Sequence, residues 1–177
     1  GKSVCISWVF VNFKEGGHYG GRIRSLADDD EKKLLQEFKN LLDQYFNAPD
    51  HLLCGHNAKE FEFPYIARRM LIQGIGLSKA LDIAGKKPWE INHLDTLQLW
   101  KFGDYKHYTS LSLLANIFNI PTPKDDISGA DVGKVYWEDQ DLERIVTYCQ
   151  KDVIALIQLF LRYRGEKLMD EENITYT

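Results

Sequence analysis

The chain has 177 residues, of which 44% are hydrophobic and 27% charged, and its net charge at pH 7 is −4. This length suffices for one domain with a sizeable core, and we expect residues 1–177 to form a single domain. The acidic balance argues against a protein that binds nucleic acid through its overall charge. No apolar run approaches the roughly 20 residues that span a bilayer, so we expect no membrane segment.

The cysteines indicate a reducing compartment. Cys5, Cys54 and Cys149 lie far apart in the sequence, and their spacing contains no Cys-x-x-Cys pair. An odd number at such spacing favours neither a disulfide framework nor a zinc site. We therefore expect three buried free thiols in a cytoplasmic protein.

The chain is predicted to begin with a β-hairpin and a helix. Residues 3–11 and 18–25 are rich in apolar and β-branched side chains, and a Gly-Gly turn signal separates them. The apolar positions of residues 31–46 follow helical spacing, with Asp29 or Asp30 as the N-cap. We interpret the acidic run before this helix as a solvated cap rather than as a metal site.

Two further helical segments should follow a short strand. Residues 51–55 are apolar enough to indicate a strand buried on both faces. A proline in the first turn and a glycine after the last residue predict a helix over residues 62–73. A second helical piece is expected over residues 77–83.

The second half of the chain is predicted to be mostly helical. Residues 92–94 read as a strand that passes into a helix after Asp95. Ser110 can cap a helix over 111–118, and residues 139–164 form one long helix or two consecutive ones. Strands that pair early and then alternate with helices are typical of an α/β domain with a mixed β-sheet flanked by helices.

The turn between the strand at 51–55 and the next helix is the first candidate site. Asn57 and Glu62 lie at the carboxyl end of this strand, where α/β sheets place their ligands. The alternative is structural: an Asx-type turn with a favourable charge at the helix N-terminus.

The last helix holds the second candidate site. Tyr148 and Asp152 are four residues apart and share a face, to one side of the expected core stripe of Ile145, Cys149, Val153, Leu156 and Phe160. The alternative is a half-buried tyrosine beside a surface aspartate.

The two candidate sites together resemble the motifs of a known family. Asn57-Ala58-Lys59-Glu60-Phe61-Glu62 is similar to Asn-x-x-x-Phe-Asp, and Tyr148-Cys149-Gln150-Lys151-Asp152 fits Tyr-x-x-x-Asp. These are motifs of the proofreading-type 3′–5′ exonucleases with a ribonuclease H-like fold, in the subclass named for four acidic residues and a tyrosine. The chain is most similar to the exonuclease domains of family B DNA polymerases and their stand-alone bacterial relatives.

The resemblance implies hydrolysis of phosphodiesters at the 3′ ends of nucleic acid, single-stranded DNA in the first place, with two Mg²⁺ or Mn²⁺ ions. Glu62 and Asp152 would be metal ligands, and Tyr148 would orient the attacking water. Asp95 would act as a capping or scaffold residue rather than as a catalytic one. Nucleic-acid contacts would come from His56, Asn57, Phe61, Tyr105 and Tyr108, with positive charge from Arg68, Arg69, Lys101 and Lys106.

Two features depart from the family pattern. The opening strand lacks the family's Asp-x-Glu, and Glu62 stands where the family has aspartate. The family's first strand is central, so we expect the central strand to be missing here. Three explanations are open: the chain is a fragment of a longer protein, a second copy in a homo-oligomer supplies the strand, or the opening strand has shifted into the vacant place. We favour the first. The alternative function is a catalytically degenerate module that binds nucleic acid or protein, while the lack of a Gly-rich phosphate loop argues against an unrelated metabolic α/β enzyme.

Overall fold

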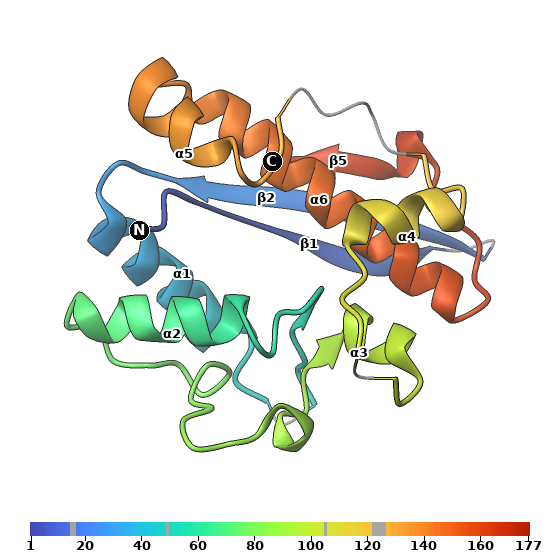
Figure 1. The fold of residues 1–177 in the computed structure, drawn as a ribbon, viewed down its shortest axis with the longest axis horizontal. Coiled ribbons are helices and arrows are strands. Elements are labelled where there is room, and N and C mark those ends of the chain that lie inside the picture. Colours follow the sequence, from blue (N-terminus) through green and yellow to red (C-terminus); the bar gives the residue numbers. More distant parts are fainter. Residues whose placement is uncertain (15–16, 49, 105, 122–126) are drawn as a thin grey trace. The chain divides into compact units, whose positions relative to one another are not determined.

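The computed structural model describes residues 1–14, 17–48, 50–104, 106–121 and 127–177, and it divides into two compact units (Figure 1). Unit 1 contains residues 1–4 and 28–108, and unit 2 contains residues 5–27 and 109–177. Among the described residues, no helix combines the length and apolar character that crossing a bilayer requires.

Unit 2 is built on a three-stranded mixed sheet. Strands β1 (Cys5–Lys14) and β2 (His18–Ala27) form the predicted antiparallel hairpin, with Lys14 opposite His18. Strand β5 (Ile174–Tyr176) pairs in parallel with β2 and gives the sheet the order β1-β2-β5. The mixed character of the sheet was expected, whereas β5 is too short to be recognised from alternation.

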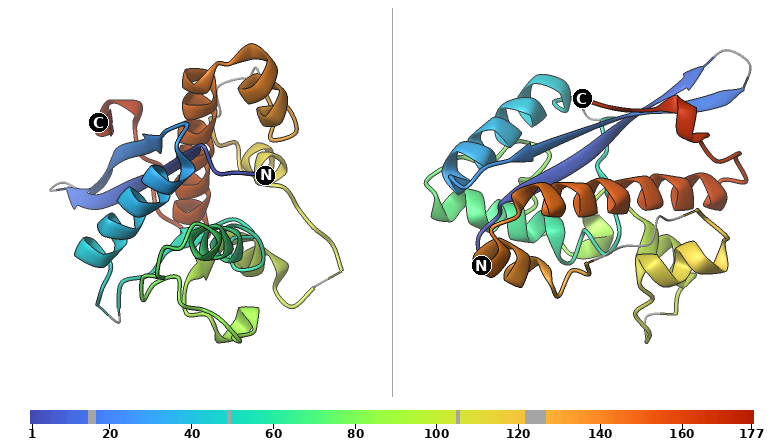
Figure 2. Two further views of the ribbon diagram at one scale, coloured as in Figure 1. Left: turned by 90° about the vertical axis from the view of Figure 1, so that its left-hand side faces the viewer. Right: turned by 90° about the horizontal axis from the view of Figure 1, so that it is seen from above.

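Helix α6 (Leu142–Tyr163) is the principal helix of unit 2 and packs against β1, β2 and α4 (Leu111–Ile117) (Figure 2). It follows the short helix α5 (Val132–Lys134) and the single π-turn η2 (Val135–Asp139). The 3₁₀ turn η3 (Glu171–Asn173) leads into β5.

The predicted core stripe of α6 is partly wrong. Ile145 is buried, but the other four members of that stripe are only half-buried, and the remaining buried positions are Ala155, Gln158, Leu159 and Leu161. The stripe assumed one covered face, whereas α6 contacts both the sheet and α4. Gln158 is buried because its side chain pairs with the backbone N–H and C=O of Met169, at 2.9 and 2.8 Å.

In unit 1, helices α1 (Glu31–Tyr45) and α2 (Glu62–Ile72) pack together. Asp30 caps α1 by accepting the N–H groups of Lys32 and Lys33, so the cap prediction is confirmed. The buried Glu31 carboxylate binds the Arg69 guanidinium, the Gln73 amide and the backbone N–H of Ser3. This cluster joins α1, α2 and the first residues of the chain.

The rest of unit 1 consists of short elements. Strands β3 (Cys54–Gly55) and β4 (Leu94–Asp95) pair in parallel as a separate two-stranded sheet, followed by α3 (Thr96–Lys101). The 3₁₀ turn η1 is Pro88–Glu90. Residues 77–83 form one hydrogen-bonded turn at Ser78 rather than the predicted helix.

The prediction of a buried strand at 51–55 is also wrong, and with it the prediction of three buried thiols. Only Cys54 and Gly55 are extended, and Cys54 is exposed, while Cys5 and Cys149 are half-buried. Among the described residues β3 pairs with β4 alone, so it lacks the second neighbour that would cover an internal strand.

Candidate functional site

A tight turn at the end of β3 presents Glu62 at the start of α2. A Cβ on Gly55 would lie 2.3 Å from the Cβ of Ala58, so only glycine fits where the turn closes. Asn57 has a φ of 63°, a left-handed conformation that asparagine tolerates better than most residues. The carbonyl of Asn57 accepts the N–H of Phe61 at 3.0 Å, and α2 begins one residue later.

Asp95 fixes this turn from the end of β4. Asp95 is 2% exposed, and its carboxylate accepts the backbone N–H groups of Asn57 at 2.9 Å and Lys59 at 3.1 Å. The same carboxylate caps α3 through the N–H groups of Leu97 and Gln98, at 3.0 and 3.3 Å. The predicted scaffold role of Asp95 is therefore confirmed. Besides capping α3, Asp95 also holds the backbone of the turn that leads to Glu62.

His56, in the same turn, contacts the ring of Tyr108. Nδ1 of the buried His56 lies 2.8 Å from the Thr96 hydroxyl, which donates to the Gly55 carbonyl. The His56 ring meets Tyr108 edge-on, with centroids 6.3 Å apart. Burial raises the pKa of the Tyr108 phenol, and the negative charges of Glu62 and Asp95 raise it further. The phenol therefore stays protonated and able to donate a hydrogen bond beside the Glu62 carboxylate.

Exposed aromatic and basic side chains lie on the same unit. Phe61 is 58% exposed and stacks on Tyr65, with centroids 6.0 Å apart and an interplanar angle of 13°, and Tyr108 is 66% exposed. Arg68 and Lys106 are exposed as well. The expectation that Arg69 supplies positive charge for nucleic acid is corrected, because its guanidinium is bound to Glu31. Tyr105 lies outside the described residues.

On unit 2, Tyr148 and Asp152 lie one turn apart on α6, and both are half-buried. The backbone at Gly129 approaches this helix, since a Cβ there would lie 3.5 Å from the Tyr148 hydroxyl. A compact turn holds that segment: Asp131 accepts the N–H and the hydroxyl of Ser128, at 2.9 and 2.6 Å. Sequence reasoning missed this neighbour of Tyr148, although Ser-x-x-Asp is a recognisable turn signal.

The predicted residues thus fall into two groups. Unit 1 brings together its group of His56, Asn57, Phe61, Glu62 and Tyr108, with Arg68 and Lys106 also on unit 1, and unit 2 holds Tyr148 and Asp152. Within the described ranges, no cluster of three or more His, Cys, Asp or Glu side chains has the geometry to hold a metal ion.

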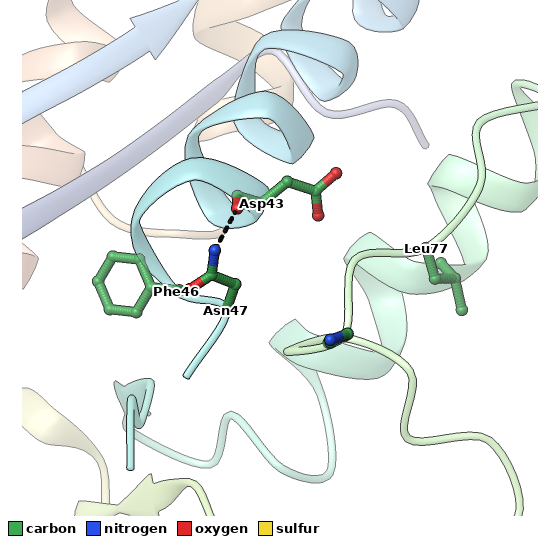
Figure 3. A pocket seen from close by; sticks show the side chains of 5 residues that line it. Asp43, Phe46, Asn47 and Leu77 are labelled. Atoms are coloured by element: carbon green, nitrogen blue, oxygen red, sulfur yellow. Dashed lines mark hydrogen bonds between the residues drawn. The ribbon is translucent and has the colours of Figure 1, made fainter. Parts of the chain in front are cut away.

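Unit 1 also has a surface pocket. It is lined by Asp43, Phe46 and Asn47 at the end of α1 and by Leu77 and Lys79 (Figure 3). The Asn47 amide donates to the Asp43 carbonyl at 3.2 Å. The pocket contains none of the predicted site residues.

The described features define a mixed α/β protein that presents an acidic and aromatic turn on one unit and a Tyr–Asp pair on the other. The family model of predicted 3′–5′ exonucleases related to the exonuclease domain of PolB matches residues 2–174, and the chain belongs to this family. The resemblance inferred from the two motifs is thereby confirmed.

A solved structure supports the likeness of the fold. The family B DNA polymerase from the hyperthermophilic archaeon Pyrobaculum calidifontis matches with a TM-score of 0.54 and 15% identity. The match covers 90% of this chain and 25% of the polymerase chain. The chain therefore spans about a quarter of the length of that polymerase, and at this identity the similarity concerns the fold alone.

Proposed function

We propose that this protein is a 3′–5′ exonuclease with a ribonuclease H-like fold that acts on the 3′ ends of single-stranded DNA with Mg²⁺ or Mn²⁺. The observation that carries the proposal is the family match over residues 2–174, together with the Tyr148–Asp152 pair on one face of a continuous helix. Half-burial of both side chains supports it, because a water-orienting phenol needs a fixed position and an open side.

The residues of the two groups would bind metal ions, orient the attacking water and contact the nucleic acid. Glu62 and Asp152 would hold divalent cations, which when bound would neutralise charge on the scissile phosphate. The Tyr148 hydroxyl would orient the attacking water through a hydrogen bond. Asn57 would contact the sugar, Phe61 and Tyr108 would stack on unpaired bases, and Arg68 and Lys106 would bind phosphates. We assign His56 a supporting role, because it is buried against Thr96 and its ring meets that of Tyr108.

We further propose that a strand outside these 177 residues supplies the missing Asp-x-Glu ligands. In the family this strand lies between the hairpin and the strand before the Asn57 turn. Here the hairpin and the β3–β4 pair belong to two separate sheets, which is what absence of a joining strand predicts. The exposure of Cys54 on β3 supports the same proposal.

The direct test is release of nucleotides from labelled single-stranded DNA, by the 177-residue chain and by the longer chain where the coding sequence continues upstream. In the longer chain, Asp152→Asn should lower the metal-dependent rate about a thousandfold and Tyr148→Phe about a hundredfold. Glu143→Gln, an exposed carboxylate on the same helix, is the matched control and should leave the rate unchanged. Full activity of Asp152→Asn would refute its role.

Metal binding gives a second, independent measurement. Mn²⁺ titration followed by electron paramagnetic resonance should show weaker binding for Asp152→Asn and Glu62→Gln, but not for Glu143→Gln. A normal Mn²⁺ affinity in both site variants would contradict their assignment as ligands.

A second function of a different class is a degenerate module that binds nucleic acid without cutting it. It is favoured by Glu62 in place of aspartate, because an added methylene moves the carboxylate by about 1.5 Å. Binding of single-stranded DNA by the longer chain, with no nucleotide release in Mn²⁺ even for Glu62→Asp, would decide for this module.

A further inference from the structure

Two cysteines that the proposed function does not use lie on elements of unit 2 that pack against each other. Cys5 is the first residue of β1 and Cys149 lies in α6, which packs along that strand. The two side chains shift each other's pKa, and both residues are half-buried. They are 144 positions apart in the sequence, so only the fold brings them together.

A row of polar contacts fixes this pair. The Cys5 sulfur lies 3.7 Å from the Ser7 hydroxyl, which is 2.8 Å from the Ser25 hydroxyl on β2. The Gln150 amide on α6 donates to the same Ser25 hydroxyl at 3.0 Å. This row connects β1, β2 and α6, so the residue beside Cys149 is itself tied to the sheet next to Cys5.

The environment makes Cys5 the better nucleophile of the two. Interaction with the Cys149 side chain lowers the pKa of the Cys5 thiol, Ser7 lowers it further, and burial acts in the opposite direction. The pKa of Cys149 is raised by interaction with the Cys5 side chain and by burial. Since the thiolate is the reactive form, an external disulfide should be attacked first by Cys5.

We propose that Cys5 and Cys149 form a reversible disulfide that fastens α6 to β1 beside Tyr148. With oxidised glutathione as the oxidant, the Cys5 thiolate attacks one glutathione sulfur, and the first glutathione leaves as a thiol. Cys149 then displaces the second glutathione, so that two protein thiols are oxidised and one glutathione disulfide is reduced to two thiols. The proposal is independent of nuclease activity, because it concerns the thiols alone.

The test is oxidation of the folded 177-residue chain with oxidised glutathione, followed by alkylation, proteolysis and mass spectrometry. We expect a Cys5–Cys149 linked peptide with Cys54 still free, and at least a tenfold higher yield in the folded chain than in urea, where a loop of 144 residues must close. The linked chain should also unfold about 5 °C or more above the reduced chain, and dithiothreitol should reverse the shift.

Two variants serve as controls. Cys54→Ser should give the same linked peptide and the same thermal shift, whereas Cys149→Ser should lose both while circular dichroism shows an unchanged fold. Glutathione adducts at Cys5 without closure to Cys149, or equal yields in folded and unfolded chains, would overturn the proposal.

Discussion

The carboxylate of Asp95 accepts the backbone N–H of Asn57 at 2.9 Å, across 38 residues of sequence. Asn57 is the left-handed residue of the turn that precedes α2, and Asp95 is the N-cap of α3. One buried side chain thus sets both the conformation of the turn and the start of a helix. The position of Glu62 at the beginning of α2 therefore depends on Asp95, which lies on β4, whereas the turn follows β3.

Asp95→Ala should therefore destabilise the protein strongly. The substitution leaves the N–H groups of Asn57, Lys59, Leu97 and Gln98 without their acceptor, and we expect a loss of about 3 kcal/mol in the free energy of unfolding. Urea unfolding followed by tryptophan fluorescence measures it.

Asp95→Asn should lie between Asp95→Ala and the natural chain, because its amide oxygen can replace Oδ1 while its NH₂ group would face the Lys59 N–H. The matched control is Asp141→Ala, an exposed cap that accepts the N–H of Arg144 and should cost about 1 kcal/mol. Equal effects of Asp95→Ala and Asp141→Ala would show that Asp95 acts only as a helix cap.

Gly55→Ala should destabilise the protein by about 2 kcal/mol or more, because the new methyl group would overlap the Cβ of Ala58. Gly76→Ala is the matched substitution at a glycine with open space around it and should change stability by less than about 1 kcal/mol. Thermal unfolding of the two variants compares them directly. Similar melting temperatures would refute the close approach at Gly55.

Stability should fall in acid as Glu31 becomes protonated. Hydrogen bonds from Arg69 lower the pKa of Glu31 from its ordinary value of 4.5 to about 2, so its contribution is complete above pH 4.5 and is lost as the pH falls towards 2. Glu31→Gln should cost about 2 kcal/mol at pH 7 and flatten this pH dependence. Urea midpoints between pH 2 and 7 measure the effect.

The control for Glu31 is the exposed pair of Lys39 and Asp43 on the same helix. Asp43→Asn should leave the pH dependence of the urea midpoint unchanged, because exposed ion pairs contribute little. A Glu31→Gln variant that keeps the full acid sensitivity would assign that sensitivity to other carboxylates.

Phe61→Ala and Tyr108→Ala should each weaken binding of single-stranded DNA roughly tenfold, in line with about 1–3 kcal/mol for a stacked base. Phe61 is the N-cap residue of α2, but its side chain accepts no hydrogen bond from the helix, so its removal should leave the helix intact. Trp89→Ala, at a side chain that is 75% exposed on the same unit, is the control. Fluorescence anisotropy with a labelled oligonucleotide measures the three affinities. Equal affinities of all three variants would contradict the prediction.

Local signals predicted the fold well wherever the backbone is governed by near neighbours. Asp30, Asp95 and Ser110 each cap the helix that follows, because a side-chain oxygen two or three residues before a free N–H needs no distant partner. The i,i+4 placement of Tyr148 and Asp152 follows from helix geometry in the same way.

Features that depend on distant partners could not be predicted. The buried face of α6 depends on α4 and on the backbone of Met169, and β5 exists only because β2 offers an edge. The turn around Asn57 was found as a motif, but the clamp from Asp95 and the approach of Gly129 to Tyr148 arise from contacts between separate elements.

The course of the chain through its two units has a consequence for biosynthesis. Residues 5–27 leave the ribosome before the whole helical part of unit 1, yet their partners in unit 2 are residues 109–177. Gln150 reaches Ser25 across 125 residues, and the backbone of Thr177 donates to Ile23, a further 27 positions along. Because such distant pairings form late, the β1–β2 hairpin has to wait, with its apolar face exposed, until α6 and β5 have also been synthesised.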